Sequence, residues 1–302
     1  MTKLDSNKLN NKLNQDKSKR QMLIISDLDG TLLDEKGELT KVTINTVKQI
    51  TSQNHLFCIA TGRTPKGSID IYNQLGLNTV LVNLNGAFIW HPRNPDFIPI
   101  NIVFSKELVV RLLSNKNIMK NIANVIVESR NGTYVLNKPM KINEIREFKK
   151  WFHIDINSNE PYFFGAEELQ NMENDPNTIL LQVPDSKLIN EIIYFLKQTF
   201  STFVVRTWSL PSSGTVIEIN TKYANKGNAV DFLESYYGIQ KDSTISFGDG
   251  ENDVELLQKA RFSYGMQNGS NIARLVSRFI TSKPNYENGV AHELKKIFLN
   301  KK

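Results

Sequence analysis

The sequence has little of the chemistry that cross-links a chain or holds a metal through sulfur and imidazole. Its 302 residues include a single cysteine, Cys58, so no disulfide can form within the chain. Cys58 lies in the apolar run HLFCIA, where we expect a small buried side chain, with a catalytic thiol as the alternative. The four histidines lack the spacing of metal ligands, which argues against a zinc site. A reducing cytoplasm fits both observations.

Long hydrophobic runs are also missing, and the excess positive charge is confined to the chain ends. No run approaches the roughly 18 apolar residues of a membrane span, so we expect no membrane partner. Residues 1–20 hold six basic and two acidic residues, giving +4, and the two final lysines supply the rest of the net +6. The neutral body gives no reason to expect a nucleic-acid partner. The polar residues 1–20 lack the apolar centre of a secretory signal, and we interpret them as a disordered basic tail.

Helical patterns alternate with short apolar runs at both ends of the sequence, which predicts an α/β fold with a parallel sheet. The expected strands include MLIIS, HLFCIA, TVLVNL and STISF. Between residues 90 and 211 the pattern changes to alternating strands and amphipathic helices, among them a hairpin from NVIVES to GTYVLN. We therefore expect a core domain of residues 21–89 and 212–302, with an α+β domain of residues 90–211 inserted into it.

Four of the expected strands end in small polar or acidic residues, namely Asp27, Thr61, Asn85 and Asp249. In an open parallel sheet, ligands bind at the carboxyl ends of the strands. We therefore expect these four side chains to lie close together.

Two aspartates follow the first strand in the stretch MLIISDLDGTLL. Alone, Asp27 and Asp29 could be ordinary turn residues. An aspartate at a strand end can also attack phosphorus and form an aspartyl-phosphate, while a second aspartate protonates the leaving alkoxide. A dianionic phosphate among carboxylates calls for Mg2+. Asp249 and Asp253, in SFGDGENDVELL, offer suitable oxygen ligands, although acidic residues here could equally cap the next helix.

Four motifs in order resemble those of the haloacid dehalogenase-like phosphatase superfamily and, within it, the Cof-type hydrolases with a large α/β cap. They are DLDGTL (27–32), ATGR (60–63), NKGNA (225–229) and GDGENDVELL (248–257), and the resemblance spans roughly residues 22–298. It implies a Rossmann-like core and an inserted cap that sets substrate specificity. The sequence departs from the pattern at YGMQNGS (264–270), where related sequences typically read MGNA, so we expect no site residue there.

The resemblance also implies a role for each matching residue. Asp27 would be the nucleophile, and Asp29 the general acid/base, whose backbone carbonyl also faces the metal. Without the motif, Lys226 would be read as a surface lysine and Thr61 as a helix cap, and Arg63 could pair with an acidic residue instead of phosphate. The expected catalytic residues are Asp27, Asp29, Thr61 and Lys226; those that bind substrate are Thr61, Gly62, Arg63, Asn85 and Asn252; and those that bind Mg2+ are Asp27, Asp29, Asp249 and Asp253.

These expectations describe a cytoplasmic, Mg2+-dependent phosphomonoester hydrolase acting on a small phosphorylated metabolite, either a sugar phosphate or a phosphorylated cofactor. One alternative is a phosphotransferase or mutase with the same aspartyl-phosphate chemistry, which would release no inorganic phosphate. A receiver-like signalling module is the non-enzyme alternative, but it has no use for Asp29 as a proton donor or for a large cap. The sequence names neither the substrate nor the oligomeric state.

Overall fold

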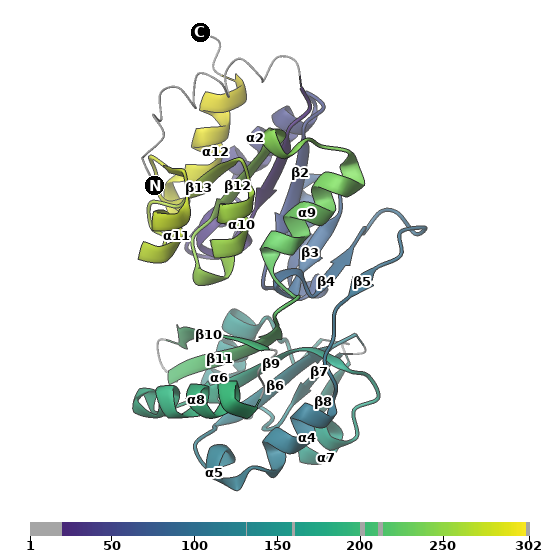
Figure 1. Ribbon diagram of the computed structural model, residues 1–302, viewed down its shortest axis with the longest axis vertical. Helices are drawn as coiled ribbons and strands as arrows, with labels where there is room; N and C mark the ends of the chain where they lie inside the picture. Colours follow the sequence, from purple (N-terminus) through teal and green to yellow (C-terminus); the bar gives the residue numbers. More distant parts are fainter. Residues whose placement is uncertain (1–19, 131, 159–160, 200–202, 211–213, 300–302) are drawn as a thin grey trace. The chain divides into compact units, whose positions relative to one another are not determined.

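The computed structural model describes residues 20–130, 132–158, 161–199, 203–210 and 214–299, and these form two compact units (Figure 1). The first unit combines the chain up to Ile100 with the chain from Asn225 onward, and the second unit is Asn101–Ala224. The expected basic tail, residues 1–20, lies outside the described residues except for Arg20. None of the helices within the described ranges is long and apolar enough to cross a membrane.

The first unit is built on an eight-stranded sheet with the strand order β14-β13-β12-β1-β2-β3-β4-β5. Neighbouring strands from β14 to β3 run parallel, and β4 pairs antiparallel with β3. The predicted α/β fold with a parallel-sheet core is therefore confirmed. The strands are β1 (Leu23–Ser26), β2 (Leu56–Ala60), β3 (Leu81–Asn83), β4 (Phe88–Trp90), β5 (Ile100–Asn101), β12 (Thr244–Gly248), β13 (Phe262–Gly265) and β14 (Phe279–Ile280).

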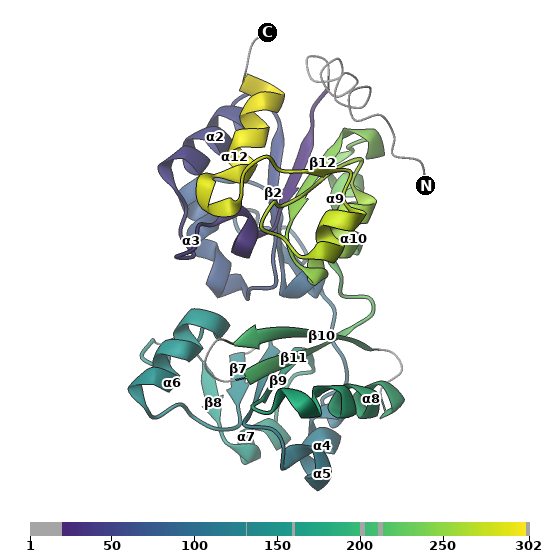
Figure 2. The ribbon, with the colours of Figure 1, turned by 90° about the vertical axis from the view of Figure 1, so that its left-hand side faces the viewer.

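Helices cover both faces of this sheet, with α2 and α12 on one side and α9 and α10 on the other (Figure 2). Strand β1 is buried on both faces because Ile24 packs into one apolar cluster while Leu23 and Ile25 pack into the other. The helices are α2 (Lys41–Thr51), α3 (Pro65–Leu75), α9 (Lys226–Tyr237), α10 (Val254–Lys259), α11 (Asn271–Val276) and α12 (Gly289–Leu294). Short helical turns are η1 (Leu28–Leu32), η2 (Leu84–Gly86), η5 (Lys241–Ser243), η6 (Glu251–Asp253), η7 (Asn285–Glu287) and η8 (Lys295–Leu299).

The second unit has a six-stranded sheet with the order β10-β11-β9-β6-β7-β8, antiparallel except for the parallel pair β7 and β8. The expected hairpin is formed by β6 and β7, in which Ser129 pairs with Gly132. The strands are β6 (Asn124–Ser129), β7 (Gly132–Val135), β8 (Tyr162–Phe164), β9 (Pro176–Val183), β10 (Phe203–Leu210) and β11 (Gly214–Thr221). The helical elements are α4 (Glu107–Ser114), α5 (Lys116–Met119), α6 (Ile142–Glu147), η3 (Phe148–Phe152), α7 (Ala166–Gln170), η4 (Ser186–Leu188) and α8 (Ile189–Thr199).

The second unit begins and ends later in the sequence than the expected residues 90–211. At its start, β4 turns back on β3, with Phe88 opposite Asn83, and so belongs to the sheet of the first unit. At its end, β10 and β11 form a hairpin that pairs with β9, so the chain stays in the second sheet as far as Thr221. Strand pairing, which spacing alone does not reveal, therefore sets both boundaries.

Candidate active site

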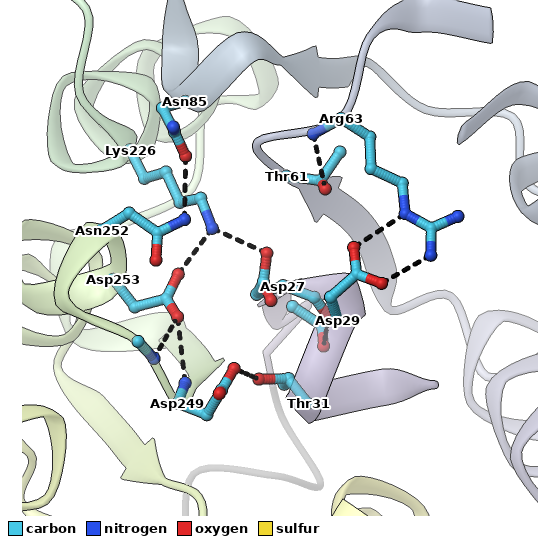
Figure 3. A network of polar contacts seen from close by, with 12 residues as sticks. Asp27, Asp29, Thr31, Thr61, Arg63, Asn85, Lys226, Asp249, Asn252 and Asp253 are labelled. Atoms are coloured by element: carbon cyan, nitrogen blue, oxygen red, sulfur yellow. Dashed lines mark hydrogen bonds and ion pairs between the residues drawn. The ribbon is translucent and has the colours of Figure 1, made fainter. Parts of the chain in front are cut away.

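The polar residues that follow the strands of the first unit lie together at the carboxyl ends of its parallel strands, which we call the C-terminal edge of the sheet (Figure 3). Asp27 directly follows β1, and its backbone N–H donates to the carbonyl of Phe247 at the end of β12. Thr61 follows β2, and the backbone N–H of Asn85 donates to the Thr61 carbonyl at 3.0 Å. The main chain thus brings together the ends of strands that are far apart in the sequence.

Lys226 is fully buried and joins two carboxylates of this edge. It is the first residue of α9, a helix capped by the side chain of Asn225, which accepts from the N–H of Asn228. Its Nζ lies 2.6 Å from Oδ1 of Asp27 and 2.6 Å from Oδ1 of Asp253. Burial disfavours the ammonium, but the carboxylates more than offset this, and the pKa of Lys226 is raised above its ordinary value. The residue is therefore a fixed buried cation, and the surface-lysine alternative is wrong.

A third carboxylate lies beside the two that hold this cation, and each of the three offers an oxygen within 4.8 Å of the other two. They belong to Asp27, Asp249 and Asp253. Burial, assisted by the charge of Asp253, raises the pKa of Asp249 to about 7. Burial also raises the pKa of Asp27 well above its ordinary value, even though Lys226 opposes the shift. One ammonium thus leaves the negative charge of three carboxylates partly uncompensated, and their hard oxygen donors fit a divalent cation such as Mg2+.

The three carboxylates differ in what already holds them. Both oxygens of Asp253 are engaged, Oδ1 by Lys226 and Oδ2 by the backbone N–H groups of Asp249 and Gly250 at 2.9 Å each. Asp249 accepts a hydrogen bond from the hydroxyl of Thr31 at 2.8 Å. Asp27 and Asp249 are therefore better placed than Asp253 to hold a metal directly. The helix-capping alternative holds in part for Asp253, whose Oδ2 binds the turn that leads into α10.

Gly30 allows the two acidic loops to approach each other. Its φ of +73° lies in the left-handed region, and a Cβ at this position would come within 2.4 Å of Oδ2 of Asp249. A side chain at Gly30 would thus displace the carboxylate of Asp249 or strain the turn.

Asp29 and Arg63 form a two-pronged ion pair beside the carboxylate cluster (Figure 3). Nε of Arg63 lies 2.7 Å from one carboxylate oxygen of Asp29, and Nη2 lies 2.5 Å from the other. The Asp29 side chain is 53% exposed, whereas that of Arg63 is only 10% exposed. The expected alternative for Arg63, pairing with an acidic residue, is the arrangement that the structure shows.

The remaining residues predicted to contact substrate lie at the same edge. Thr61 is buried and accepts the N–H of Arg63 at 3.1 Å, whereas the N-cap of α3 is Thr64, so the helix-cap alternative for Thr61 is wrong. The amide of Asn252 donates to Oδ1 of Asn85 at 3.0 Å. Gly62 lies against the Asn85 side chain, where a Cβ would come within 3.3 Å of Oδ1. The structure thus brings all ten predicted site residues to one edge.

The sequence missed two residues that support this edge, Thr31 and Asn268. Thr31 binds Asp249 as described, and the Asn268 side chain donates to the carbonyl of Gly30 at 2.8 Å while accepting the N–H of Asn285 at 2.9 Å. Asn268 lies in the segment 264–270, where no site residue was expected. A usable signal existed, because β13 is another parallel strand and the residues after Gly265 must emerge at the same edge.

Comparisons with known proteins agree with this architecture. A family model described as haloacid dehalogenase-like hydrolase matches residues 24–294. A 5-amino-6-(5-phospho-D-ribitylamino)uracil phosphatase of Bacillus subtilis is 28% identical over 278 residues, covering 91% of this chain and 97% of that protein. A haloacid dehalogenase-like hydrolase from Bacteroides thetaiotaomicron has a TM-score of 0.75 at 21% identity, over 92% of this chain and 100% of that one. A subclass IIB sugar phosphatase of the same superfamily has a TM-score of 0.72 at 20% identity, over 91% and 98% of the two chains.

Proposed function

The chain belongs to the haloacid dehalogenase-like hydrolase family and is a phosphatase, and we propose that it hydrolyses small phosphomonoesters through a covalent intermediate on Asp27. One observation carries this proposal above the others. The carboxylate of Asp27 is buried against the ammonium of Lys226 at 2.6 Å, and Asp253 holds that ammonium from the other side. A nucleophile fixed beside a buried cation suits attack on a phosphate whose charge must be offset in the transition state.

In the proposed first step, the Asp27 oxygen not bound by Lys226 attacks phosphorus. The new O–P bond forms as the bond to the leaving oxygen breaks. Asp29 enters this step as the neutral acid and gives its proton to the leaving oxygen. In the second step Asp29 takes a proton from water, whose oxygen attacks phosphorus and restores the Asp27 carboxylate. Lys226 stays a cation throughout, because the carboxylates on either side of it raise its pKa. Inorganic phosphate and an alcohol are the products.

Mg2+ would be held by carboxylate oxygens of Asp27 and Asp249, with the backbone carbonyl of Asp29, and would offset the charge that otherwise repels a phosphate dianion. The fit rests on the oxygen donors within 4.8 Å of one another and on the raised pKa values of Asp27 and Asp249. We assign Asp253 to holding Lys226 and the loop of Asp249, since hydrogen bonds already engage both of its oxygens. We assign Thr61, Gly62, Asn85 and Asn252 to the transferring phosphoryl group.

We propose a substrate whose phosphate is esterified to a sugar or a sugar-alcohol carbon. The Bacillus subtilis relative is named for a phosphoribityl compound, and one structural neighbour is named a sugar phosphatase. Both names describe phosphate esters of small hydroxyl-rich molecules, which supports this class. We also propose that the enzyme works in the reducing cytoplasm, where its one cysteine stays a thiol.

The test compares Asp27→Asn with Asp70→Asn, a matched change at an exposed position on α3. Phosphate release is measured across a panel of phosphorylated metabolites, with Mg2+ and with excess chelator. We expect Asp27→Asn to lose several orders of magnitude in kcat while staying folded, and Asp70→Asn to resemble the wild type. Near-normal phosphate release by folded Asp27→Asn would refute the proposal. Transfer to a sugar hydroxyl without phosphate release would instead support the phosphotransferase alternative.

A further inference from the structure

Every nitrogen of the Arg63 guanidinium donates to a protein oxygen. Nε and Nη2 bind the two carboxylate oxygens of Asp29 at 2.7 and 2.5 Å, and Nη1 binds the carbonyl of Gly67 at 3.0 Å. The Nε–Nη2 edge is the one with which arginine grips planar or tetrahedral anions bidentately. Asp29 therefore occupies the edge that a phosphate would need.

The main chain of Arg63 is held as firmly as its side chain. Its N–H donates to the hydroxyl of Thr61 at 3.1 Å, and its carbonyl accepts from the N–H of Leu84 at 3.1 Å and the side chain of Asn83 at 2.9 Å. With 10% of its side chain exposed, Arg63 is the fixed member of the pair, and Asp29, at 53%, is the member with room to move. A salt bridge of this kind restricts the rotamers of the more exposed side chain.

We propose that Arg63 acts on the reaction through Asp29, as a positioning residue for the acid/base carboxyl and not as a ligand of the substrate phosphate. The inference rests on the proposed function, because it needs Asp29 to deliver a proton to the leaving group. Displacing a reacting group by about 1 Å can cost on the order of 100-fold in rate. Losing Arg63 should therefore damage the proton transfer while leaving phosphate binding largely intact.

Leaving-group dependence separates the two roles. Phenyl phosphate has a basic leaving group that benefits from protonation, whereas 2,4-dinitrophenyl phosphate expels a stable anion that needs no proton. The parameter to compare is kcat/KM, because it reports the steps up to departure of the leaving group and excludes the later attack by water. For Arg63→Ala we expect kcat/KM to fall about 100-fold on phenyl phosphate and only about threefold on the dinitrophenyl ester.

A double-mutant cycle with Asp29→Asn makes the test stricter. If Arg63 works through Asp29, adding Arg63→Ala to Asp29→Asn should cost little more than Asp29→Asn alone. Arg63→Lys keeps the positive charge but loses the two-pronged guanidinium contact with Asp29. It should therefore show the same difference between the two esters in weaker form, and it replaces Arg63→Ala in the test if that variant fails to fold. Arg111→Ala, an exposed change in the second unit, should leave both esters unaffected.

Two outcomes would overturn the inference while leaving the proposed function standing. One is an equal loss of kcat/KM on both esters, and the other is a full additional loss from Arg63→Ala in the Asp29→Asn background. Either result would show that Arg63 does not act through Asp29. If Asp29→Asn itself showed no leaving-group dependence, the acid/base role of Asp29 in the proposed function would fail instead.

Discussion

Replacing Asp249 by asparagine should stabilise the metal-free protein and make its stability insensitive to Mg2+. Asparagine keeps an oxygen that can accept the hydrogen bond from Thr31 at 2.8 Å, so the loop geometry is preserved while one negative charge of the cluster is removed. Burial raises the pKa of Asp249 from 3.8 to about 7, which means that keeping this carboxylate ionised opposes folding.

The size and direction of the effect depend on pH. Between pH 3.8 and about 7, the folded protein retains a proton that the unfolded chain releases. The wild-type free energy of unfolding therefore falls as pH rises through this window. The variant has no ionisable group at position 249, so its free energy of unfolding lacks this pH dependence. Below pH 4 the two proteins should be equally stable. Above pH 7 in chelator, the free energy of unfolding of the variant should exceed that of the wild type by at most about 4 kcal/mol, which corresponds to a difference on the order of 10 °C in Tm.

Mg2+ should narrow this difference by stabilising the wild type more than the variant. A cation present at about 100 times its Kd stabilises a binding protein by roughly 2.7 kcal/mol, and Asp249→Asn has lost one of its ligands. The assay is thermal unfolding at pH 5 and pH 8, each with chelator and with Mg2+.

The control for this assay is Glu128→Gln in the second unit. Glu128 is buried, accepts the Thr133 hydroxyl at 2.8 Å, and has its pKa raised by burial to about 7. This variant should gain stability at pH 8 but respond to Mg2+ as the wild type does. An Asp249→Asn variant no more stable than the wild type at pH 8 in chelator would refute the reasoning.

Three further predictions concern the turn, the thiol and the tail. Gly30→Ala should abolish phosphate release and the stabilisation by Mg2+, because the new Cβ would collide with the carboxylate of Asp249. The control is Gly238→Ala, which has a similar φ of +65° but no atom within 4 Å of the new Cβ, and which should only lower Tm. Cys58 should resist alkylation at pH 8 until the protein unfolds, since burial raises its pKa to about 12, and rapid labelling of the folded protein would contradict this. A chain starting near Lys19 should keep its phosphatase activity and lose only weak, salt-sensitive adhesion to anionic surfaces; a large fall in kcat/KM would show that the tail belongs to the enzyme.

Patterns that depend on local physics were predictable from the sequence. Residues 22–25 are continuously apolar because β1 is covered on both faces, and this pattern is visible without a structure. The convergence of Asp27, Thr61, Asn85 and Asp249 follows from the parallel direction of the strands, since all their carboxyl ends share one edge. The resemblance then added Lys226, which no pattern of hydrophobicity would have selected.

Features that depend on tertiary pairing were not predictable. Arg63 carries the same sequence signal whether it binds phosphate or Asp29, and only the distances of 2.7 and 2.5 Å distinguish the two. The place of Asn268 after the parallel strand β13 could have been predicted, but its contact could not, because its partner is the backbone carbonyl of Gly30, 238 residues earlier in the chain. The limits of the second unit could not be predicted for a related reason. The sequence of a hairpin such as β10 with β11 does not show which of the two sheets this hairpin pairs with.

The central position of β1 has a consequence for how the protein is made. One neighbour, β2, leaves the ribosome soon after it, but the other, β12, pairs Thr244 with Leu23 and is translated only after the whole second unit. At about 5–20 residues per second, β1 waits on the order of 10 to 40 seconds for that neighbour. The second unit is continuous in sequence and can close its own sheet during this delay, whereas the first unit keeps an open apolar edge. Nascent chains halted before β12 should therefore carry a folded second unit and an N-terminal segment that depends on chaperones.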